Sequence, residues 1–285
     1  MKNVLVFALV ISLVAGIFSG CSSSLFDSRN VGGDSGSNNP VDAHDSSDYN
    51  SNRQIDSFRN VPGITEQDIA DVEELIARRD SFIFGNLLGT ELYLNRYGEM
   101  EGFTAFLCDW FTQIFGIEFE PRIYEWVDLL DGLESGDIDF TGELAVTSER
   151  QADNYIMTDG VAKRLVVYFC VEGRPPIDEI KEERAPNYGF LSHTTTLDYV
   201  RARHEGPFGT FIFDNIADIY GALEGGVIDA FIGESTAEEA FNMHSDIVIE
   251  DFLPPVYGSI SISTKKPDNE PIIRVIQKII DSDDF

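Results

Sequence analysis

Positively charged residues are scarce in this sequence. Its 285 residues include 20 Lys and Arg against 50 Asp and Glu, for a formal net charge of −30. So acidic a chain is repelled by the phosphate backbones of DNA and RNA, which excludes nucleic acid as a partner. The acidity alone does not indicate a cationic ligand, because extracellular protein surfaces are often acidic for solubility.

Cysteine and histidine are also few, with 3 and 4 residues. No His or Cys has a second one placed to make a metal site, so we expect no metal and no cofactor. Nor does the sequence contain a nucleophile–base pair or a phosphate loop, so we expect no catalytic residue. Cys108 and Cys170 could pair in an exported protein, although their places on a helix face and a strand favour two free thiols. The sequence leaves this alternative open.

Long apolar runs are missing after residue 21. Residues 4–18 form an apolar run too short and too early for a dedicated membrane span, which is typical of a secretory signal. Phe18-Ser19-Gly20-Cys21 resembles a bacterial lipobox, in which small residues give a peptidase access and the thiol carries the lipid. We expect a signal peptide at 1–20 and a lipidated Cys21, with a flexible Ser-, Asn-, Asp- and Gly-rich tether to residue 63. The alternative is an uncleaved anchor helix with an incidental cysteine.

The most informative stretch covers residues 129–159. A helical face of leucines ends at Gly136, residues 138–141 predict a short buried strand, and Gly142-Glu143 follows where that strand runs out. Thr147 then begins the next helix as its N-cap, three residues before Arg150. One turn of chain therefore offers a carboxylate, unpaired N–H donors, a hydroxyl and an Arg, which could together hold a small zwitterion.

A shorter copy of this pattern occurs about 90 residues later. Residues 133–139, Leu-Glu-Ser-Gly-Asp-Ile-Asp, are echoed by residues 223–229, Leu-Glu-Gly-Gly-Val-Ile-Asp, and each copy leads to Gly-Glu, at Glu143 and at Glu234. A helix, a Gly stop and a hydrophobic strand are the units of an open parallel sheet, whose ligands bind beyond the carboxyl ends of the strands. Two copies indicate two similar lobes that each present a carboxylate.

Four further segments have clear signatures. Thr65 and Asp68 form a predicted capping box at the start of a helix, and residues 81–85 predict the first strand. Apolar residues at helical spacing predict a core-facing helix over 103–115 that includes Phe103 and Phe106. The Gly and Pro residues of 173–176 predict the first hinge.

The ordered motifs resemble one known family. Leu-x-x-Gly-x-Ile-Asp at residues 133–139, Thr-x-Glu-Arg at 147–150 and Tyr-Ile-Met-Thr-Asp at 155–159 are similar to the polar amino-acid group of extracellular solute-binding proteins, family 3. The nearest branch serves as sensor modules of bacterial signalling proteins. The resemblance implies an α/β, two-lobe periplasmic-binding-protein (type II) clamshell, whose lobes are open, mostly parallel sheets flanked by helices and joined by two hinge strands. The first lobe would span 64–171 and the return segment 254–285, with the second lobe at 172–253.

The resemblance also implies a ligand site. Arg150 would bind an α-carboxylate through a bidentate ion pair, with help from Thr147 and Thr195, and Glu234 would bind the α-ammonium. Aromatic walls would come from Tyr93 and Trp126. Three positions depart from the family pattern: Ala145 replaces a hydroxyl residue, Glu143 replaces a small or hydroxyl residue, and His193 replaces a glycine. Glu143 would favour a cationic group on the ligand.

The function implied is binding of an amino acid or related zwitterion by a membrane-tethered, extracytoplasmic monomer. The loaded form would be read by an ABC permease or by a signalling receptor. Two alternatives remain open. One is an enzyme on the same fold, similar to the cyclohexadienyl dehydratases, with Glu143 as general acid. The other is a degenerate clamshell that serves only as a protein-interaction module.

Overall fold

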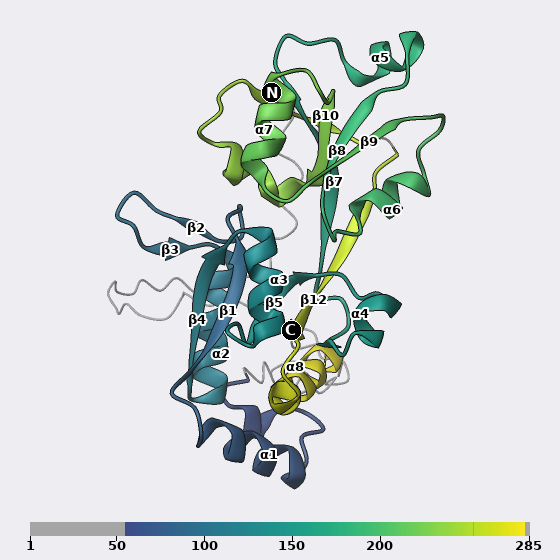
Figure 1. Cartoon of the computed structure of the whole chain (residues 1–285). Coiled ribbons are helices and arrows are strands. Elements are labelled where there is room, and N and C mark those ends of the chain that lie inside the picture. Colours follow the sequence, from purple (N-terminus) through teal and green to yellow (C-terminus); the bar gives the residue numbers. More distant parts are fainter. Residues whose placement is uncertain (1–54, 253, 283–285) are drawn as a thin grey trace, which may run out of the picture. The chain divides into compact units, whose positions relative to one another are not determined.

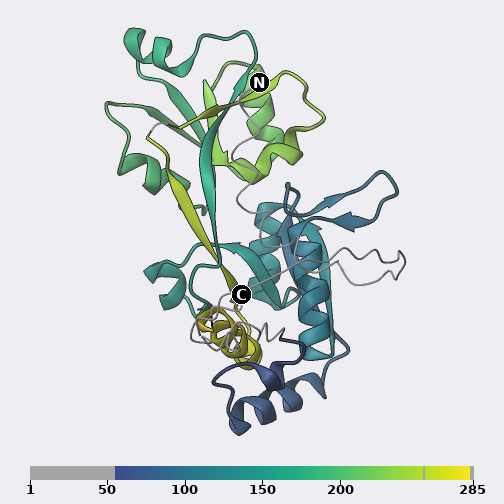
Figure 2. The ribbon, with the colours of Figure 1, turned by 180° about the vertical axis from the view of Figure 1, so that it is seen from behind.

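The computed structural model describes residues 55–252 and 254–282, which fall within one compact unit, Asn52–Phe285. Cys21, the signal peptide and most of the expected tether lie outside the described residues. Within this unit the chain forms two lobes joined by two long antiparallel strands, β7 (Ala162–Val171) and β12 (Tyr257–Thr264) (Figure 1). Figure 2 shows the same two strands between the lobes from behind.

The first lobe is built around the parallel strands β4-β1-β5, with the end of β12 antiparallel beside β5. Its strands are β1 (Ser81–Leu87), β4 (Glu118–Tyr124), β5 (Phe140–Leu144), β6 (Ile156–Met157) and the hairpin β2 (Tyr93–Leu94) and β3 (Met100–Glu101). Its helices are η2 (Phe58–Asn60), α1 (Glu66–Ile76), α2 (Phe103–Phe115), α3 (Trp126–Ser135), α4 (Ser148–Ala152), η4 (Pro267–Asn269) and α8 (Glu270–Asp281). Helices α1, α2 and α8 contribute to one buried core, and α3 packs in a second.

The second lobe repeats this plan with the parallel strands β10-β8-β9, and β7 antiparallel beside β10. Its elements are α5 (Ile177–Glu183), β8 (Asn187–Leu191), α6 (Thr196–Arg201), β9 (Gly209–Phe213), α7 (Ile216–Glu224), β10 (Ala230–Glu234), η3 (Ser235–Phe241) and β11 (Ile247–Asp251). Residues of α5 and α6 pack in one buried cluster, and residues of α7 and η3 pack in another. The expected α/β architecture of two open, mostly parallel sheets with two hinge strands is confirmed.

The position of the hinge differs from the expected one. Residues 162–165 of β7 pair with β12, whereas residues 166–171 pair with β10 and β11 in the second lobe. The chain therefore changes lobe near Leu165, before the expected boundary at residue 171. Gly173 lies in the turn that follows β7, so its positive φ of 80° serves that turn rather than a hinge.

The packed chain also begins earlier than expected. Ile55, Phe58 and Val61 are buried in the first-lobe core, and the Phe58 ring stacks on Phe115 at a centroid distance of 5.9 Å. Three apolar side chains spaced three residues apart give the end of the expected tether a buried face. Across the part of the chain described, no helix combines the length and apolar character that a membrane crossing requires.

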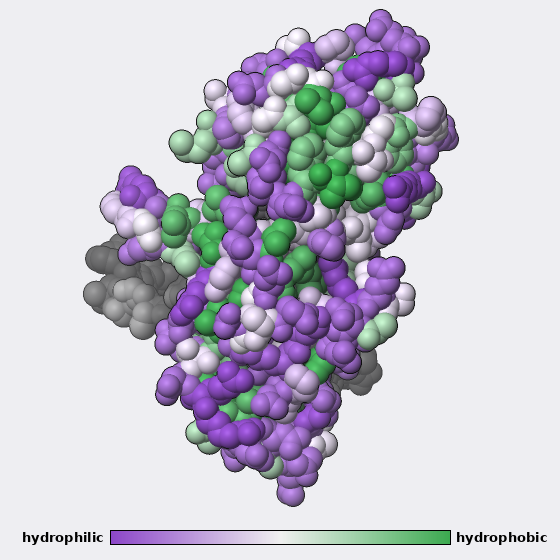
Figure 3. All heavy atoms as spheres, viewed as in Figure 1, coloured by the Kyte–Doolittle hydropathy of each residue, from purple (hydrophilic) through white to green (hydrophobic). Residues whose placement is uncertain are grey.

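Several local expectations can be checked directly. Both hydrogen bonds of the Thr65–Asp68 capping box are present, and α2 has the expected bounds. Cys108 and Cys170 are free and buried, as favoured. Phe103 and Phe106 are a correction, because they are 49% and 53% exposed although their helical phase suggested the core. Hydrophilic residues cover most of the visible face in Figure 3, as the acidic composition requires.

Candidate functional site

A cavity of about 290 Å³ lies between the lobes and touches both of them. Its first-lobe wall comes from the end of β1 and the loop after it, the β4–α3 turn and the segment after β5. Its second-lobe wall comes from the starts of α6 and α7, the end of β10 and helix η3. Four carboxylates line it, Glu91, Glu125, Glu143 and Glu234, but only two guanidiniums, Arg150 and Arg164. The lining therefore carries an excess of negative charge.

The repeated sequence pattern explains how two of these carboxylates reach the cavity. Asp139 exchanges backbone and side-chain hydrogen bonds with Ile83 of β1, and Asp229 does the same with Asn187 of β8. Each Asp thus anchors its copy against a neighbouring parallel strand. The strands β5 and β10 that follow carry Glu143 and Glu234 at their carboxyl ends, where ligands bind in open parallel sheets.

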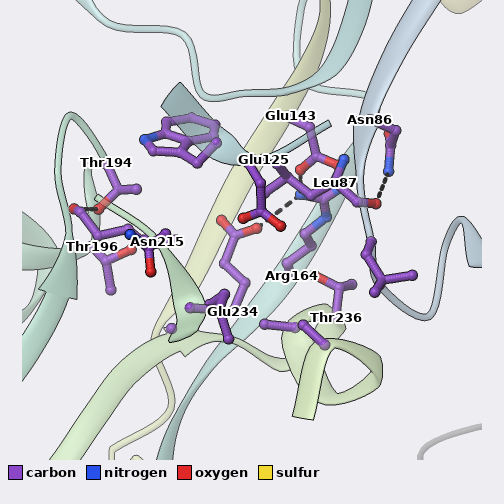
Figure 4. A pocket seen from close by; sticks show the side chains of 18 of the residues that line it. Asn86, Leu87, Glu125, Glu143, Arg164, Thr194, Thr196, Asn215, Glu234 and Thr236 are labelled. Carbon is purple, nitrogen blue, oxygen red and sulfur yellow. Dashed lines mark hydrogen bonds and ion pairs between the residues drawn. The ribbon is translucent and has the colours of Figure 1, made fainter. Parts of the chain in front are cut away.

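Arg164 occupies the centre of the acidic part of the cavity. Its Nη1 donates to Oε2 of Glu143 at 2.5 Å and to Oε2 of Glu234 at 2.9 Å. Its Nε and Nη2 donate to the two oxygens of Glu91 at 3.2 and 2.5 Å. Figure 4 shows Glu143 and Glu234 converging on Arg164 from different sides. Below, Arg164, Glu91, Glu143 and Glu234 are called the Arg164 cluster.

Sequence reasoning missed Arg164 and Glu91. The Arg164 side chain is only 4% exposed, and it lies in the strand Ala-Lys-Arg-Leu-Val-Val-Tyr-Phe-Cys-Val, which is otherwise largely apolar. A charged residue in a buried strand must have partners of opposite charge. The Arg in this apolar strand was therefore the sequence signal for a buried ion-pair cluster. Its carboxylates are 21 to 73 residues away along the chain, and no local pattern connects them.

Glu143 lines the cavity as expected, but both of its oxygens have protein partners. Oε1 accepts the backbone N–H of Leu87 at 3.2 Å, and Oε2 accepts from Arg164. The side chain is 5% exposed. This carboxylate therefore ties β5 to β1 and to the hinge strand, and it is placed less favourably for a ligand cation than the sequence suggested.

Glu234 is in a different position. Its Oε2 accepts from Arg164, whereas its Oε1 has no hydrogen-bond donor among the residues that the structure describes. Burial raises the pKa of this carboxyl above its ordinary value, and the Arg164 guanidinium opposes the rise. The side chain keeps 25% exposure. Glu234 can therefore offer a free carboxylate oxygen to a donor in the cavity.

Arg150 also lines the cavity, and within the described chain it forms no ion pair. Its Nη1 donates to the carbonyl oxygen of Ala145 at 2.8 Å, and its Nη2 donates to that of His193, in the other lobe, at 3.1 Å. Burial lowers the pKa of the guanidinium, which is the effect expected of a partly desolvated cation without a carboxylate partner. Since a guanidinium has five N–H donors, donors remain for a ligand anion.

The two expected threonines are placed differently. Thr147 is the N-cap of α4, its Oγ1 accepts the backbone N–H of Arg150 at 3.1 Å, and it does not line the cavity. Thr195 lines the cavity, together with Thr194 and Thr196. It begins α6 without using its side chain as a cap. Thr147 therefore positions the segment that carries Arg150, whereas Thr195 can face a ligand.

The aromatic expectations divide in the same way. Trp126 lines the cavity, and its Nε1 donates to the backbone oxygen of Ser192 in the other lobe at 2.5 Å. Tyr93 lies in the β2–β3 hairpin and is not part of the lining, which instead contains Tyr124 at the end of β4.

Among residues 55–252 and 254–282, no group of three or more His, Cys, Asp or Glu could hold a metal ion.

No protein-family model matches the sequence, and no curated protein matches it. Solved structures of amino-acid-binding proteins resemble its fold. The arginine-bound form of truncated ArgBP from T. maritima has 18% sequence identity and a TM-score of 0.58, over 74% of this chain and 99% of that chain. The arginine-, lysine-, histidine-binding protein ArtJ from Geobacillus stearothermophilus has 19% identity and a TM-score of 0.54, over 72% and 90%. The amino acid ABC transporter substrate-binding protein AbpA from Streptococcus pneumoniae, bound to L-arginine, has 16% identity and a TM-score of 0.56, over 74% and 93%. The chain therefore has the two-lobed α/β fold of periplasmic amino-acid-binding proteins.

Proposed function

We propose that this protein binds a small amino acid with a cationic side chain in the cavity between its lobes. Arg150 binds the α-carboxylate, and Glu234 binds the α-ammonium group. One observation supports the assignment most strongly: a guanidinium without an ion pair in the described chain and a carboxylate with a free oxygen line the same cavity, one from each lobe. A zwitterion complements that arrangement.

The charge of the lining favours the cationic side chain. After Arg150 and Glu234 have bound the zwitterion, the Arg164 cluster and the exposed Glu125 leave negative charge in excess. Trp126 and Tyr124 add aromatic surface, which attracts cations as well as apolar groups. The solved structures of similar fold that are bound to arginine agree with a ligand of this class.

The cellular role rests on the N-terminal sequence. With a signal peptide before Cys21 and a lipid on that cysteine, the protein would be a monomer tethered outside the cytoplasm. It would deliver its ligand to an ABC transporter or report it to a signalling receptor. Replacing Cys21→Ser in the full chain should abolish metabolic labelling with palmitate and release the protein from the membrane fraction. Retention of both the label and the membrane association would contradict the anchor.

Ligand binding can be tested by thermal shift and calorimetry on a protein that begins at Asn52, so that Ile55 and Phe58 stay packed. Basic, neutral and acidic amino acids and polyamines form the panel. A ligand at about one hundred times its Kd should stabilise the fold by about 2.7 kcal/mol. We expect L-arginine or L-lysine to bind, and Arg150→Ala to weaken binding by at least roughly 100-fold.

Two control variants keep this test specific. Arg201→Ala removes an arginine that is 58% exposed and does not line the cavity, and Glu205→Gln neutralises an exposed acid. Neither should alter affinity. Binding that survives in Arg150→Ala would contradict the proposed site. A folded protein that binds nothing in the panel would instead favour the interaction module.

The enzyme alternative depended on Glu143 as a general acid. Both oxygens of that side chain accept hydrogen bonds, from Leu87 and from Arg164. Both oxygens are therefore occupied by donors of the protein itself, whereas a general acid must present an oxygen to its substrate. The contacts of Glu143 therefore support binding rather than catalysis.

A further inference from the structure

Arg164 lines the cavity, yet the proposed binding of a zwitterion does not use it. The residue lies on β7 opposite Gly258 of β12, where the two hinge strands pair. Its carboxylate partners come from both lobes: Glu91 and Glu143 from the first and Glu234 from the second. The hinge thus carries a buried cation into the middle of the ligand cavity.

The hydrogen bonds of the Arg164 cluster use nearly all of its carboxylate oxygens. Both oxygens of Glu91 accept from Arg164, and those of Glu143 accept from Arg164 and Leu87. Oε2 of Glu234 also accepts from Arg164. Within the described residues, Oε1 of Glu234 is the carboxylate oxygen of the cluster that stays available.

Gly258 keeps that oxygen accessible. A Cβ atom at Gly258 would lie 2.9 Å from Oε1 of Glu234, closer than ordinary contacts of such atoms allow. The lack of a side chain on the paired hinge strand therefore lets the carboxylate sit against the backbone without being displaced. Arg164 and Gly258 face each other across the hinge pair and act on the same carboxylate.

We propose that Arg164 determines the charge of the ligand that the cavity accepts. It is a positioning residue that occupies the oxygens of Glu91 and Glu143 and offsets one of their two negative charges. The cluster then offers a ligand one available carboxylate oxygen, Oε1 of Glu234, opposite the available guanidinium of Arg150, and keeps only a moderate excess of negative charge. The cavity thereby selects an amino acid over a polyamine that has several cations and no carboxylate. This inference rests on the proposed function, because it assumes that Arg150 and Glu234 bind the ligand.

Electrostatics gives the reason. Without Arg164, three carboxylates that are 5 to 25% exposed would converge, and charge interactions between partly buried groups are stronger than in water. They would need cations, and a polyamine supplies several on one flexible chain. In the wild-type protein the Arg164 guanidinium already supplies a cation to these carboxylates, so a ligand with several cations gains less.

The test compares the affinities of the full-length protein, purified in detergent, for L-arginine and spermidine by calorimetry. The wild-type protein should prefer L-arginine. In Arg164→Gln the ratio of the two affinities should shift toward spermidine by at least roughly 30-fold. Arg164→Lys keeps the charge and should keep most of the preference. The matched control is Arg184→Gln, which removes an arginine bound to Asp229 away from the cavity and should leave the ratio unchanged.

A change in selectivity separates this role from a merely structural one, which would weaken both probes alike. If Arg164→Gln does not fold, the double variant Arg164→Gln, Glu143→Gln removes one charge of each sign and should still shift the ratio by at least about 10-fold. A folded variant with an unchanged ratio overturns the role of Arg164 alone. A wild-type protein that binds neither these probes nor any amino acid overturns the proposed function as well.

Discussion

The two Gly-Glu pairs, at Glu143 and Glu234, share a local sequence but differ in burial and hydrogen bonding. Both glutamates lie at the carboxyl end of a strand that follows a Leu-Glu-x-Gly-x-Ile-Asp segment, and both reach the same cavity. Glu143 is 5% exposed and has a hydrogen bond to each oxygen, whereas Glu234 is 25% exposed and keeps one oxygen available. The first is a structural member of the cavity wall, and the second is suited to a ligand.

The aspartates that precede them show the opposite behaviour. Asp139 and Asp229 each accept a backbone N–H from a neighbouring parallel strand, at 2.9 and 2.7 Å, and each donates its own N–H to that strand. The repeat therefore preserves the strand anchor in both lobes. The two copies differ at the glutamate. Both glutamates accept from Arg164 of β7, but only Glu143 also accepts from Leu87 of β1, and neither partner belongs to the repeat.

The largest difference in stability is expected between the two aspartates. Asp139 is 5% exposed and holds Lys266 at 2.5 Å as well as Arg79 and Asn269, whereas the Arg184 partner of Asp229 is 52% exposed. Asp139→Ala should lower the free energy of unfolding by about 4 kcal/mol, because it leaves a partly buried ammonium without its partner. Asp229→Ala should cost about 2 kcal/mol. Urea denaturation measures both, and equal losses would contradict the contrast.

The next effect separates the two glutamates by affinity. Glu234→Gln should weaken binding of the amino-acid ligand by about 100-fold, because a charged hydrogen bond to the α-ammonium is lost. Glu143→Gln should weaken it by less than about 10-fold, since its oxygens already have protein partners. Calorimetry on both variants provides the comparison. A larger loss in Glu143→Gln would reverse the assignment.

The two glycines give a smaller contrast in stability. A Cβ atom at Gly233 would lie 2.6 Å from the ring of Phe231, which is 1% exposed and packed against Phe169. One at Gly142 would make ordinary contacts of 3.7 Å with Phe84. Gly233→Ala should therefore destabilise the protein by about 2 kcal/mol and Gly142→Ala by less than about 0.5 kcal/mol. Melting temperatures of the two variants measure this contrast. Equal melting temperatures would contradict it.

The pH dependence is the smallest effect and has two opposite signs. Burial raises the pKa of Glu234 above its ordinary 4.5, opposed by Arg164, with Glu91 and Glu143 nearby raising it further. The protonated Glu234 carboxyl therefore stabilises the fold. Its contribution is fully present below pH 4.5 and is lost as the pH rises through the pKa of Glu234 in the folded protein. Ligand affinity should instead rise over that range, by up to about tenfold per pH unit, because the ammonium binds the ionised form. Calorimetry across this pH range, on wild type and on Glu234→Gln, tests the prediction. If the affinity of Glu234→Gln depends on pH as that of wild type does, the prediction is contradicted.

Much of the fold could be predicted from local signals. The capping box at Thr65, the bounds of α2 and the strand ends at Glu143 and Glu234 all follow from patterns within a few residues. Helical phase was less informative at Phe103 and Phe106, because it gives the apolar side of a helix but not how far the neighbouring elements cover it. The sequence placed Tyr93 on the cavity wall, where the structure has Tyr124.

The candidate site was predictable where the chain itself carries the ligand groups. Arg150 and Glu234 line the cavity, and each is placed by the cap or strand that the sequence indicated. The Arg164 cluster could not be foreseen, because Arg164 and Glu91 are 73 residues apart and meet only through the tertiary fold. Without those contacts, Glu143 and Glu234 look equivalent.

The most direct test of this account is a crystal structure of the complex with the amino acid that binds most tightly. We expect the ligand carboxylate on Arg150 and its ammonium within about 3 Å of Oε1 of Glu234, with Arg164 still paired to Glu91 and Glu143. A ligand cation seated on Glu143 with Arg164 displaced, or a ligand outside the cavity, would contradict the account.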